Sequence, residues 1–131
     1  MTTRIASCSC GQLQAEVTGP PLRVSVCHCD ACQRRTGSVF GAQARFDRDT
    51  VTIKGHGTEF VRVGSEGGTC RFTFCPACGA TVYYVADDRQ QHIAIPVGAF
   101  ADPAFPPPTV SVYEECMHSW VGLPKDIEHI Q

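Results

Sequence analysis

The sequence predicts an all-β fold with few or no helices. Glycine and proline interrupt the chain at short intervals, with 12 Gly and 9 Pro in 131 residues. Between these interruptions, apolar and polar residues alternate with the two-residue period of half-buried strands. Segments with the 3.6-residue period of an amphipathic helix are almost absent. These three observations favour short strands joined by turns.

The expected strands follow this alternation along the chain. Apolar and polar residues alternate over 12–17, where Leu13, Ala15 and Val17 share one face, and again over 50–54. Gly55-His56-Gly57 then indicates a turn into 59–63, so we expect these two strands to form a hairpin. Further candidate strands are residues 38–45, 70–74, 81–85, 92–97 and 110–113.

One or two helical turns are expected only at residues 30–35. Pro103 and the prolines at 106–108 predict an extended connection before the last of these strands. No repeat, low-complexity tail or linker divides the chain, so residues 1–131 are expected to form a single domain. No apolar run approaches the roughly 18 residues of a membrane span, so we expect a soluble protein without a membrane partner.

Seven of the nine cysteines fall into three tight clusters. The clusters are Cys8-Ser9-Cys10, Cys27-His28-Cys29-Asp30-Ala31-Cys32 and Cys75-Pro76-Ala77-Cys78. Thiolates two or three residues apart on a turn can meet one tetrahedral Zn²⁺ at about 2.3 Å. Disulfides usually join distant segments, and the odd total and the start of the chain, which does not resemble a secretion signal, also disfavour them. Zinc is therefore the expected cofactor, with iron–sulfur ligation as a lesser alternative.

The number of ligands suggests two kinds of zinc site. A structural zinc has four protein ligands, whereas a catalytic zinc has three and keeps one position for substrate. Either Cys8/Cys10 join Cys75/Cys78 in a closed site and leave the middle cluster with its own exchangeable metal, or the ligands mix across all clusters. We prefer the first pairing, because Cys-x-Cys-x-x-Cys places three thiolates on one short turn. The closed site would clamp distant segments together, so we expect chelation to unfold the protein.

The charge pattern excludes one class of partner and suggests another. The formal net charge is −2, without the basic face that nucleic-acid binding requires. Arg34 and Arg35 follow the middle cluster and could offset its negative charge or hold a substrate carboxylate. We favour Arg34 as the substrate-binding residue, against the alternative that both are solvated surface residues.

The cysteine motifs also carry a resemblance to a known family. Ser-Cys-Ser-Cys-Gly at 7–11, Cys-His-Cys-Asp-Ala-Cys-Gln-Arg-Arg-Thr-Gly at 27–37 and Phe-Cys-Pro-Ala-Cys-Gly at 74–79 occur in the order and separation of the glutathione-dependent formaldehyde-activating enzyme and centromere protein V family. Trp120, in Ser-Trp-Val-Gly-Leu-Pro, extends the similarity toward the end of the chain. The resemblance implies a tent-like β fold with two zinc ions. It places the structural zinc on Cys8, Cys10, Cys75 and Cys78, and the reactive zinc on Cys27, Cys29 and Cys32.

The leading hypothesis follows from the motifs and the resemblance together. We expect a cytoplasmic zinc enzyme, a carbon–sulfur lyase like S-(hydroxymethyl)glutathione synthase, acting on adducts of a small glutathione-like thiol with a small aldehyde such as formaldehyde. Cys27, Cys29 and Cys32 are its expected catalytic metal ligands. The alternative is a non-catalytic, zinc-stabilised binding module in which only the four-cysteine site is filled. The sequence leaves the oligomeric state open.

Four further residues have less specific expectations. His28, between two expected ligands, is predicted to lie beside the metal site or face solvent rather than to bind metal. Cys70 and Cys116 are expected to be buried free cysteines, although Cys116 could approach the reactive site. Trp120 fits either the core or the wall of a pocket.

Overall fold

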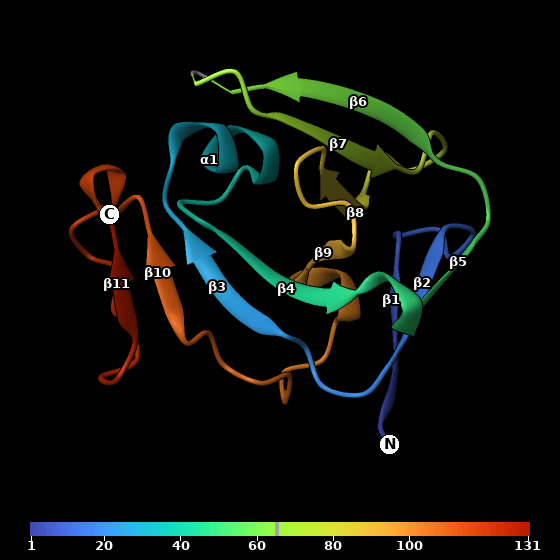
Figure 1. The fold of residues 1–131 in the computed structure, drawn as a ribbon, viewed down its shortest axis with the longest axis horizontal. Helices are drawn as coiled ribbons and strands as arrows, with labels where there is room; N and C mark the ends of the chain where they lie inside the picture. The colour runs from blue at the N-terminus through green and yellow to red at the C-terminus, as the bar shows by residue number, and fades with distance from the viewer. Residues whose placement is uncertain (65) are drawn as a thin grey trace.

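Strands dominate the structure, a computed structural model that describes residues 1–64 and 66–131 (Figure 1). Within these residues there is one α-helix, α1 (Asp30–Thr36), and three short 3₁₀ turns, η1 (Arg48–Thr50), η2 (Val97–Phe100) and η3 (Glu114–Cys116). The strands are β1 (Thr3–Ser7), β2 (Gln14–Thr18), β3 (Arg23–Cys27), β4 (Gly41–Asp47), β5 (Val51–Lys54), β6 (Thr58–Val63), β7 (Thr69–Phe74), β8 (Thr81–Ala86), β9 (His92–Pro96), β10 (Val110–Val112) and β11 (Glu128–Ile130). The predicted β class with few helices is confirmed.

The strands form two open sheets of different size. The smaller sheet has the antiparallel order β1-β2-β5. The larger has the order β11-β10-β3-β4-β9-β8-β7-β6, in which β10 runs parallel to both β3 and β11 while the other pairs are antiparallel. Figure 1 shows the large sheet curling, so that β6 and β7 lie across from β3 and β4, with α1 at one end of the space between them.

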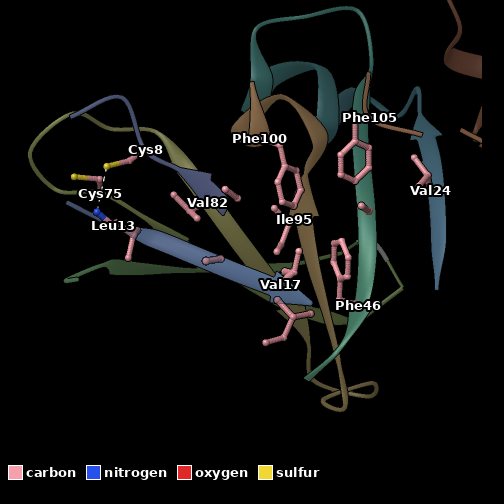
Figure 2. Close-up of a cluster of buried hydrophobic side chains, with 14 residues drawn as sticks. Cys8, Leu13, Val17, Val24, Phe46, Cys75, Val82, Ile95, Phe100 and Phe105 are labelled. Atoms are coloured by element: carbon pink, nitrogen blue, oxygen red, sulfur yellow. Dashed lines mark hydrogen bonds between the residues drawn. The ribbon is translucent and has the colours of Figure 1, made fainter. Parts of the chain in front are cut away.

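The hydrophobic core lies between the small sheet and the outer face of this curl. Leu13, Ala15 and Val17 of the small sheet are almost fully buried, as their alternation predicts, and they pack in one cluster with residues of the large sheet such as Phe46 and Ile95 (Figure 2). Burying each large apolar side chain contributes about 1.5–3 kcal/mol. Because successive strand residues point to opposite faces, burial of Phe46 in the core directs its neighbour Arg45 to the inner face of the curl.

The predicted hairpin of 50–54 with 59–63 is wrong. Strand β5 pairs with β2 in the small sheet, whereas β6 pairs with β7 in the large one, so residues 55–57 cross between the sheets. Gln12 fixes this crossing, because its side chain donates to the His56 carbonyl at 2.7 Å and accepts from the His56 N–H at 3.0 Å. A contact between residues 44 positions apart thus overrides the local turn signal.

The other elements agree with the sequence to within a few residues. The expected strands at 70–74, 81–85, 92–97 and 110–113 correspond to β7, β8, β9 and β10, while the one expected at 38–45 begins only at Gly41. Strands β1, β3 and β11 are additional. Residues 101–109, which carry the proline run, form turns and extended chain.

Helix α1 forms where a helical turn was expected. The Cys29 side chain caps its start by accepting from the Cys32 N–H at 3.3 Å, and Gly37, with a φ of 72°, ends it. Within the described part of the chain, no helix has the length and apolarity that a membrane span requires.

Candidate metal centres and the cavity beside the three-cysteine cluster

The first and third cysteine clusters meet in space. The sulfur atoms of Cys8, Cys10, Cys75 and Cys78 all lie within 4.8 Å of one another, on two loops separated by more than 60 residues. The Cys10 sulfur is 3.6 Å from that of Cys8 and 3.6 Å from that of Cys75. A disulfide would bring two sulfurs to about 2.05 Å, so these are converging free thiols.

Backbone and side-chain donors point at these sulfurs. The N–H of Leu13 lies 3.3 Å from the Cys8 sulfur and that of Ala77 lies 3.4 Å from the Cys75 sulfur. The Gln12 amide donates to the Cys75 sulfur at 3.0 Å, and this hydrogen bond lowers the pKa of Cys75 to about 6. The glycine after each cysteine pair has a positive φ, 87° at residue 11 and 83° at residue 79, as the Cys-Gly pattern requires. This environment favours thiolates.

The donor set fits zinc. Four thiolates around Zn²⁺ at about 2.3 Å form a tetrahedron whose edges are about 3.8 Å, close to the two sulfur–sulfur distances of 3.6 Å. Amide donors to the sulfurs are the usual outer contacts of such a centre. The residues could therefore hold a metal ion with little movement.

The middle cluster is local. Cys27 ends β3, Cys29 caps α1 and Cys32 lies in the first turn of that helix, and their three sulfurs lie within 4.8 Å of one another. No fourth Cys, His, Asp or Glu of the described residues joins this group. Cys27 and Cys32 are buried, while Cys29 is partly exposed. Three donors are what a substrate-binding zinc requires.

The charges around this cluster favour thiolate on Cys32. A hydrogen bond with Cys27 lowers the pKa of Cys32 to about 5, and the nearby charges of Arg35 and Arg62 act in the same direction. The same hydrogen bond and burial raise the pKa of Cys27. Of these two thiols, Cys32 is therefore the more acidic.

His28 is fully buried, which rules out the solvent-facing position that was one of its two expected settings. Its side chain does not join the three-cysteine group, and Nε2 lies 3.0 Å from the Ser111 hydroxyl on β10. Its backbone N–H donates to the Val112 carbonyl at 3.1 Å. Burial lowers the pKa of the imidazole and favours its neutral form. His28 therefore ties the three-cysteine turn to β10.

The three-cysteine cluster lies at the wall of a large cavity on the inner face of the curled sheet. The cavity has a volume of about 1350 Å³ and is lined by the cluster, by aromatic residues and by arginines. The six lining arginines are Arg23, Arg34, Arg35, Arg45, Arg62 and Arg89, and the acidic lining residues are Asp30 and Glu66. A negatively charged metal–thiolate centre would therefore face a predominantly positive pocket.

Arg34 and Arg35 differ in depth. Arg34 is exposed at the edge of the cavity, whereas the guanidinium of Arg35 lies over the rings of Phe72 and Tyr84, at 5.3 and 5.4 Å from their centres. A side chain at Gly41 would lie 3.3 Å from Arg35 Nη2 and 3.4 Å from the Cys32 Cβ. Glycine at this position therefore lets Arg35 lie next to the cysteine cluster. Sequence reasoning favoured Arg34, but Arg35 is the more deeply placed.

The remaining cysteines and Trp120 lie outside both clusters. Cys70 and Cys116 are partly exposed rather than buried, and neither belongs to a group that could hold a metal. Trp120 is 72% exposed, so it is neither in the core nor at the cavity wall.

Comparison with known proteins agrees with the geometry. A family model described as "Glutathione-dependent formaldehyde-activating enzyme" matches residues 3–116, a span that contains all seven clustered cysteines. The chain belongs to this family. Membership indicates a glutathione-related, formaldehyde-activating function.

The family's fold is represented among solved structures. The crystal structure of a Rhodobacter sphaeroides protein from a structural genomics programme has a TM-score of 0.58 to this chain, with 19% identity. The match covers 76% of this chain and 91% of the Rhodobacter chain. At this identity the likeness concerns the fold alone. No curated protein matches the sequence.

Proposed function

We propose that this family member is a zinc-dependent carbon–sulfur lyase acting on adducts of a small glutathione-like thiol with a small aldehyde. One observation carries the proposal: three converging cysteine sulfurs lie at the wall of an arginine-lined cavity. Family membership supports glutathione and formaldehyde as the chemical class. All nine cysteines are free, which suits a reducing compartment such as the cytoplasm.

The reaction joins a thiol to an aldehyde without oxidation or reduction. The sulfur forms a bond to the carbonyl carbon, the carbonyl π bond breaks, and the thiol proton ends on the resulting hydroxyl oxygen. In the reverse direction the carbon–sulfur bond breaks and the aldehyde and thiol are released. The enzyme must therefore bind the substrate sulfur as thiolate and transfer one proton to the oxygen of the former carbonyl.

Cys27, Cys29 and Cys32 would hold the working zinc, and Cys8, Cys10, Cys75 and Cys78 the structural one. When bound by three thiolates, zinc supplies a further coordination position at which a substrate thiol is held as thiolate near neutral pH. The chain positions its three ligands through the end of β3 and the capped start of α1.

The cavity residues would orient the rest of the substrate. Its volume of about 1350 Å³ exceeds the roughly 300–1,000 Å³ of typical small-molecule pockets, so a peptide-sized thiol adduct has room. Arg35, beside Cys32, and Arg34, at the edge, would bind a carboxylate. Burial raises the pKa of Tyr84, which keeps this cavity hydroxyl protonated and able to donate to the aldehyde oxygen.

Exchange NMR tests the proposal. With glutathione and formaldehyde at equilibrium, the rate of exchange between free formaldehyde and S-(hydroxymethyl)glutathione should rise in proportion to the concentration of zinc-loaded protein. Cys29→Ser should return the rate to that of buffer, while Cys70→Ser, which removes a thiol outside both clusters, should not. A rate equal to that of buffer with protein carrying two zinc ions per chain would refute the proposed activity. One zinc per chain would instead support the non-catalytic module.

A further inference from the structure

The end of the cavity farther from the cysteines holds a second group of positive charges. Arg23 of β3 and Arg45 of β4 are directly paired across the two strands, and both line the cavity. Arg89, in the turn between β8 and β9, and His92, at the start of β9, line it as well. We call these four residues the distal basic cluster.

The arginines of the distal basic cluster form no ion pair with another described residue. Among residues 1–64 and 66–131, the ion pairs involve Lys54, Arg71 and His129, but none of these arginines. Asp47 follows Arg45 by two residues on β4 and is paired with His92 on β9, so its carboxylate lies near the cluster. Its Oδ1 atom already accepts from the Asp49 N–H and the Gln91 amide, each at 2.9 Å.

Two nitrogen atoms of the distal basic cluster are buried without a partner. Arg23 Nε and His92 Nδ1 are shielded from solvent, and neither has a hydrogen-bond partner within the described residues. Arg45 is only partly exposed, and its pKa is lowered by burial and by the neighbouring charges of Arg89 and Arg23.

Such an arrangement is costly unless an anion completes it. Arginine stays charged in proteins, so a fold cannot relieve the repulsion by releasing protons. Buried polar groups are normally hydrogen-bonded, and charges that leave water are normally paired. Grouped arginines with free N–H donors are the usual means of binding carboxylate or phosphate oxygens.

The distal basic cluster lies in line with the cysteine site. Arg23, Ser25 and Cys27 alternate on β3 and therefore share the cavity face. Four residues of strand separate Arg23 from Cys27 by about 13 Å. Between them, Gln43 donates to the Ser25 hydroxyl at 2.8 Å, and its amide oxygen is buried without a partner in the described chain. One extended ligand could span both ends.

We propose that Arg23, Arg45, Arg89 and His92 form an oxyanion subsite that holds a carboxylate or phosphate at the tail of the substrate thiol. The inference that the subsite binds oxyanions rests on this arrangement alone. That the oxyanion belongs to the thiol rests on the proposed function. The substrate class is then a thiol that carries an oxyanionic group at the far end of an extended chain.

Anion titrations test the subsite without reference to thiol chemistry. In calorimetric titrations of the zinc-loaded protein with inorganic phosphate or glutarate, we expect saturable binding that weakens at least tenfold in Arg45→Gln and in Arg89→Gln. Arg89 is exposed on a turn, so this second variant should fold even if the first does not. Arg71→Gln, which removes an exposed, ion-paired arginine outside the cavity, is the matched control and should bind like the parent. Cys29→Ser should also bind phosphate, since Cys29 is not part of the distal basic cluster.

Matched thiols identify the source of the oxyanion. The dissociation constant of 4′-phosphopantetheine should be at least tenfold below that of pantetheine if the tail is a phosphate, and that of glutathione at least tenfold below that of its ethyl ester if it is a carboxylate. Arg89→Gln should remove whichever difference is found.

The outcomes separate the subsite from the proposed function. Absence of phosphate and glutarate binding, or equal binding by Arg89→Gln and the parent, would overturn the subsite. Anion binding without any difference within either thiol pair would overturn its assignment to the substrate tail. Anion binding in a protein that shows no exchange activity would refute the proposed function and leave the oxyanion subsite standing.

Discussion

The two cysteine clusters offer the same ligand atoms in different structural settings. The four-cysteine cluster joins the loop after β1 to the loop after β7, whereas the three-cysteine cluster lies within one turn between β3 and α1. Closing a longer loop removes more chain entropy, so a metal in the first cluster constrains the whole fold. A metal in the second constrains almost nothing beyond its own turn.

The surroundings of the two clusters also differ. The four-cysteine cluster touches the hydrophobic core, in which Cys8 and Cys75 are both buried. The three-cysteine cluster faces a cavity with six arginines. A stabilising metal needs a closed coordination shell, and a reactive one needs access and charges that hold substrate. The comparison therefore supports the proposal that one cluster serves stability and the other serves chemistry.

The largest expected effect is the loss of the long-range clamp. Cys75→Ser should unfold or aggregate the protein, because structural zinc contributes on the order of 10 kcal/mol in small domains. Thermal melts and metal counts of the purified variant would measure this, with Cys70→Ser as the control. A variant that melts like the parent with two metals bound would show that these four cysteines do not form one stabilising site.

An intermediate effect is expected where the three-cysteine turn is tied to the sheet. Ser111→Ala should cost about 1–3 kcal/mol, because it leaves the Nε2 of buried His28 without its hydrogen-bond partner. Denaturant unfolding would measure the loss, and exposed Ser38→Ala should be neutral. If Ser111→Ala were equally neutral, His28 would not anchor this turn.

A smaller effect is expected beside the four-cysteine cluster. Gln12→Ala should cost about 0.5–1.5 kcal/mol in total, because water can replace most of the bonds from Gln12 to His56 and the Cys75 sulfur in this partly exposed setting. Gln90→Ala, on an exposed turn, is the matched control. The metal count should stay at two in both variants, and loss of a metal in Gln12→Ala would mean that this amide is needed for coordination.

The smallest effect on stability is expected in the three-cysteine cluster itself. Cys29→Ser should change the free energy of unfolding by less than about 1 kcal/mol, because its metal closes no long loop, yet it should remove one zinc per chain. Circular dichroism would remain that of the parent. Failure of this variant to fold would overturn the division of tasks.

The sequence predicted the local features of the site and missed those that depend on distant pairing. Spacing alone indicated the middle cluster and α1, because every residue involved lies within ten positions. The hairpin was wrong because Gln12, far from the turn, determines where residues 55–57 lie. The burial of His28 depends on β10, whose residue Ser111 lies 83 positions later in the sequence.

The cavity arginines show where a sequence signal existed but was incomplete. Arg23 and Cys27 are separated by an even number of positions within one strand, so recognising β3 would have placed both side chains on one face of the sheet. The pairing of Arg23 with Arg45 requires the register of β3 against β4, which alternation does not specify. The approach of Arg35 to Cys32 depends on Gly41, whose role is visible only in three dimensions.

The central claim is that the three-cysteine cluster holds a metal to which a substrate thiol binds. The most direct measurement is the absorption of cobalt-substituted protein during titration with glutathione. An incoming sulfur changes the ligand field, so the thiolate-to-cobalt charge-transfer bands should shift and saturate in the millimolar range or below. Cobalt-loaded Cys29→Ser should show no such shift. Unchanged spectra of the parent with glutathione, cysteine and a thiol without a carboxylate would contradict the claim.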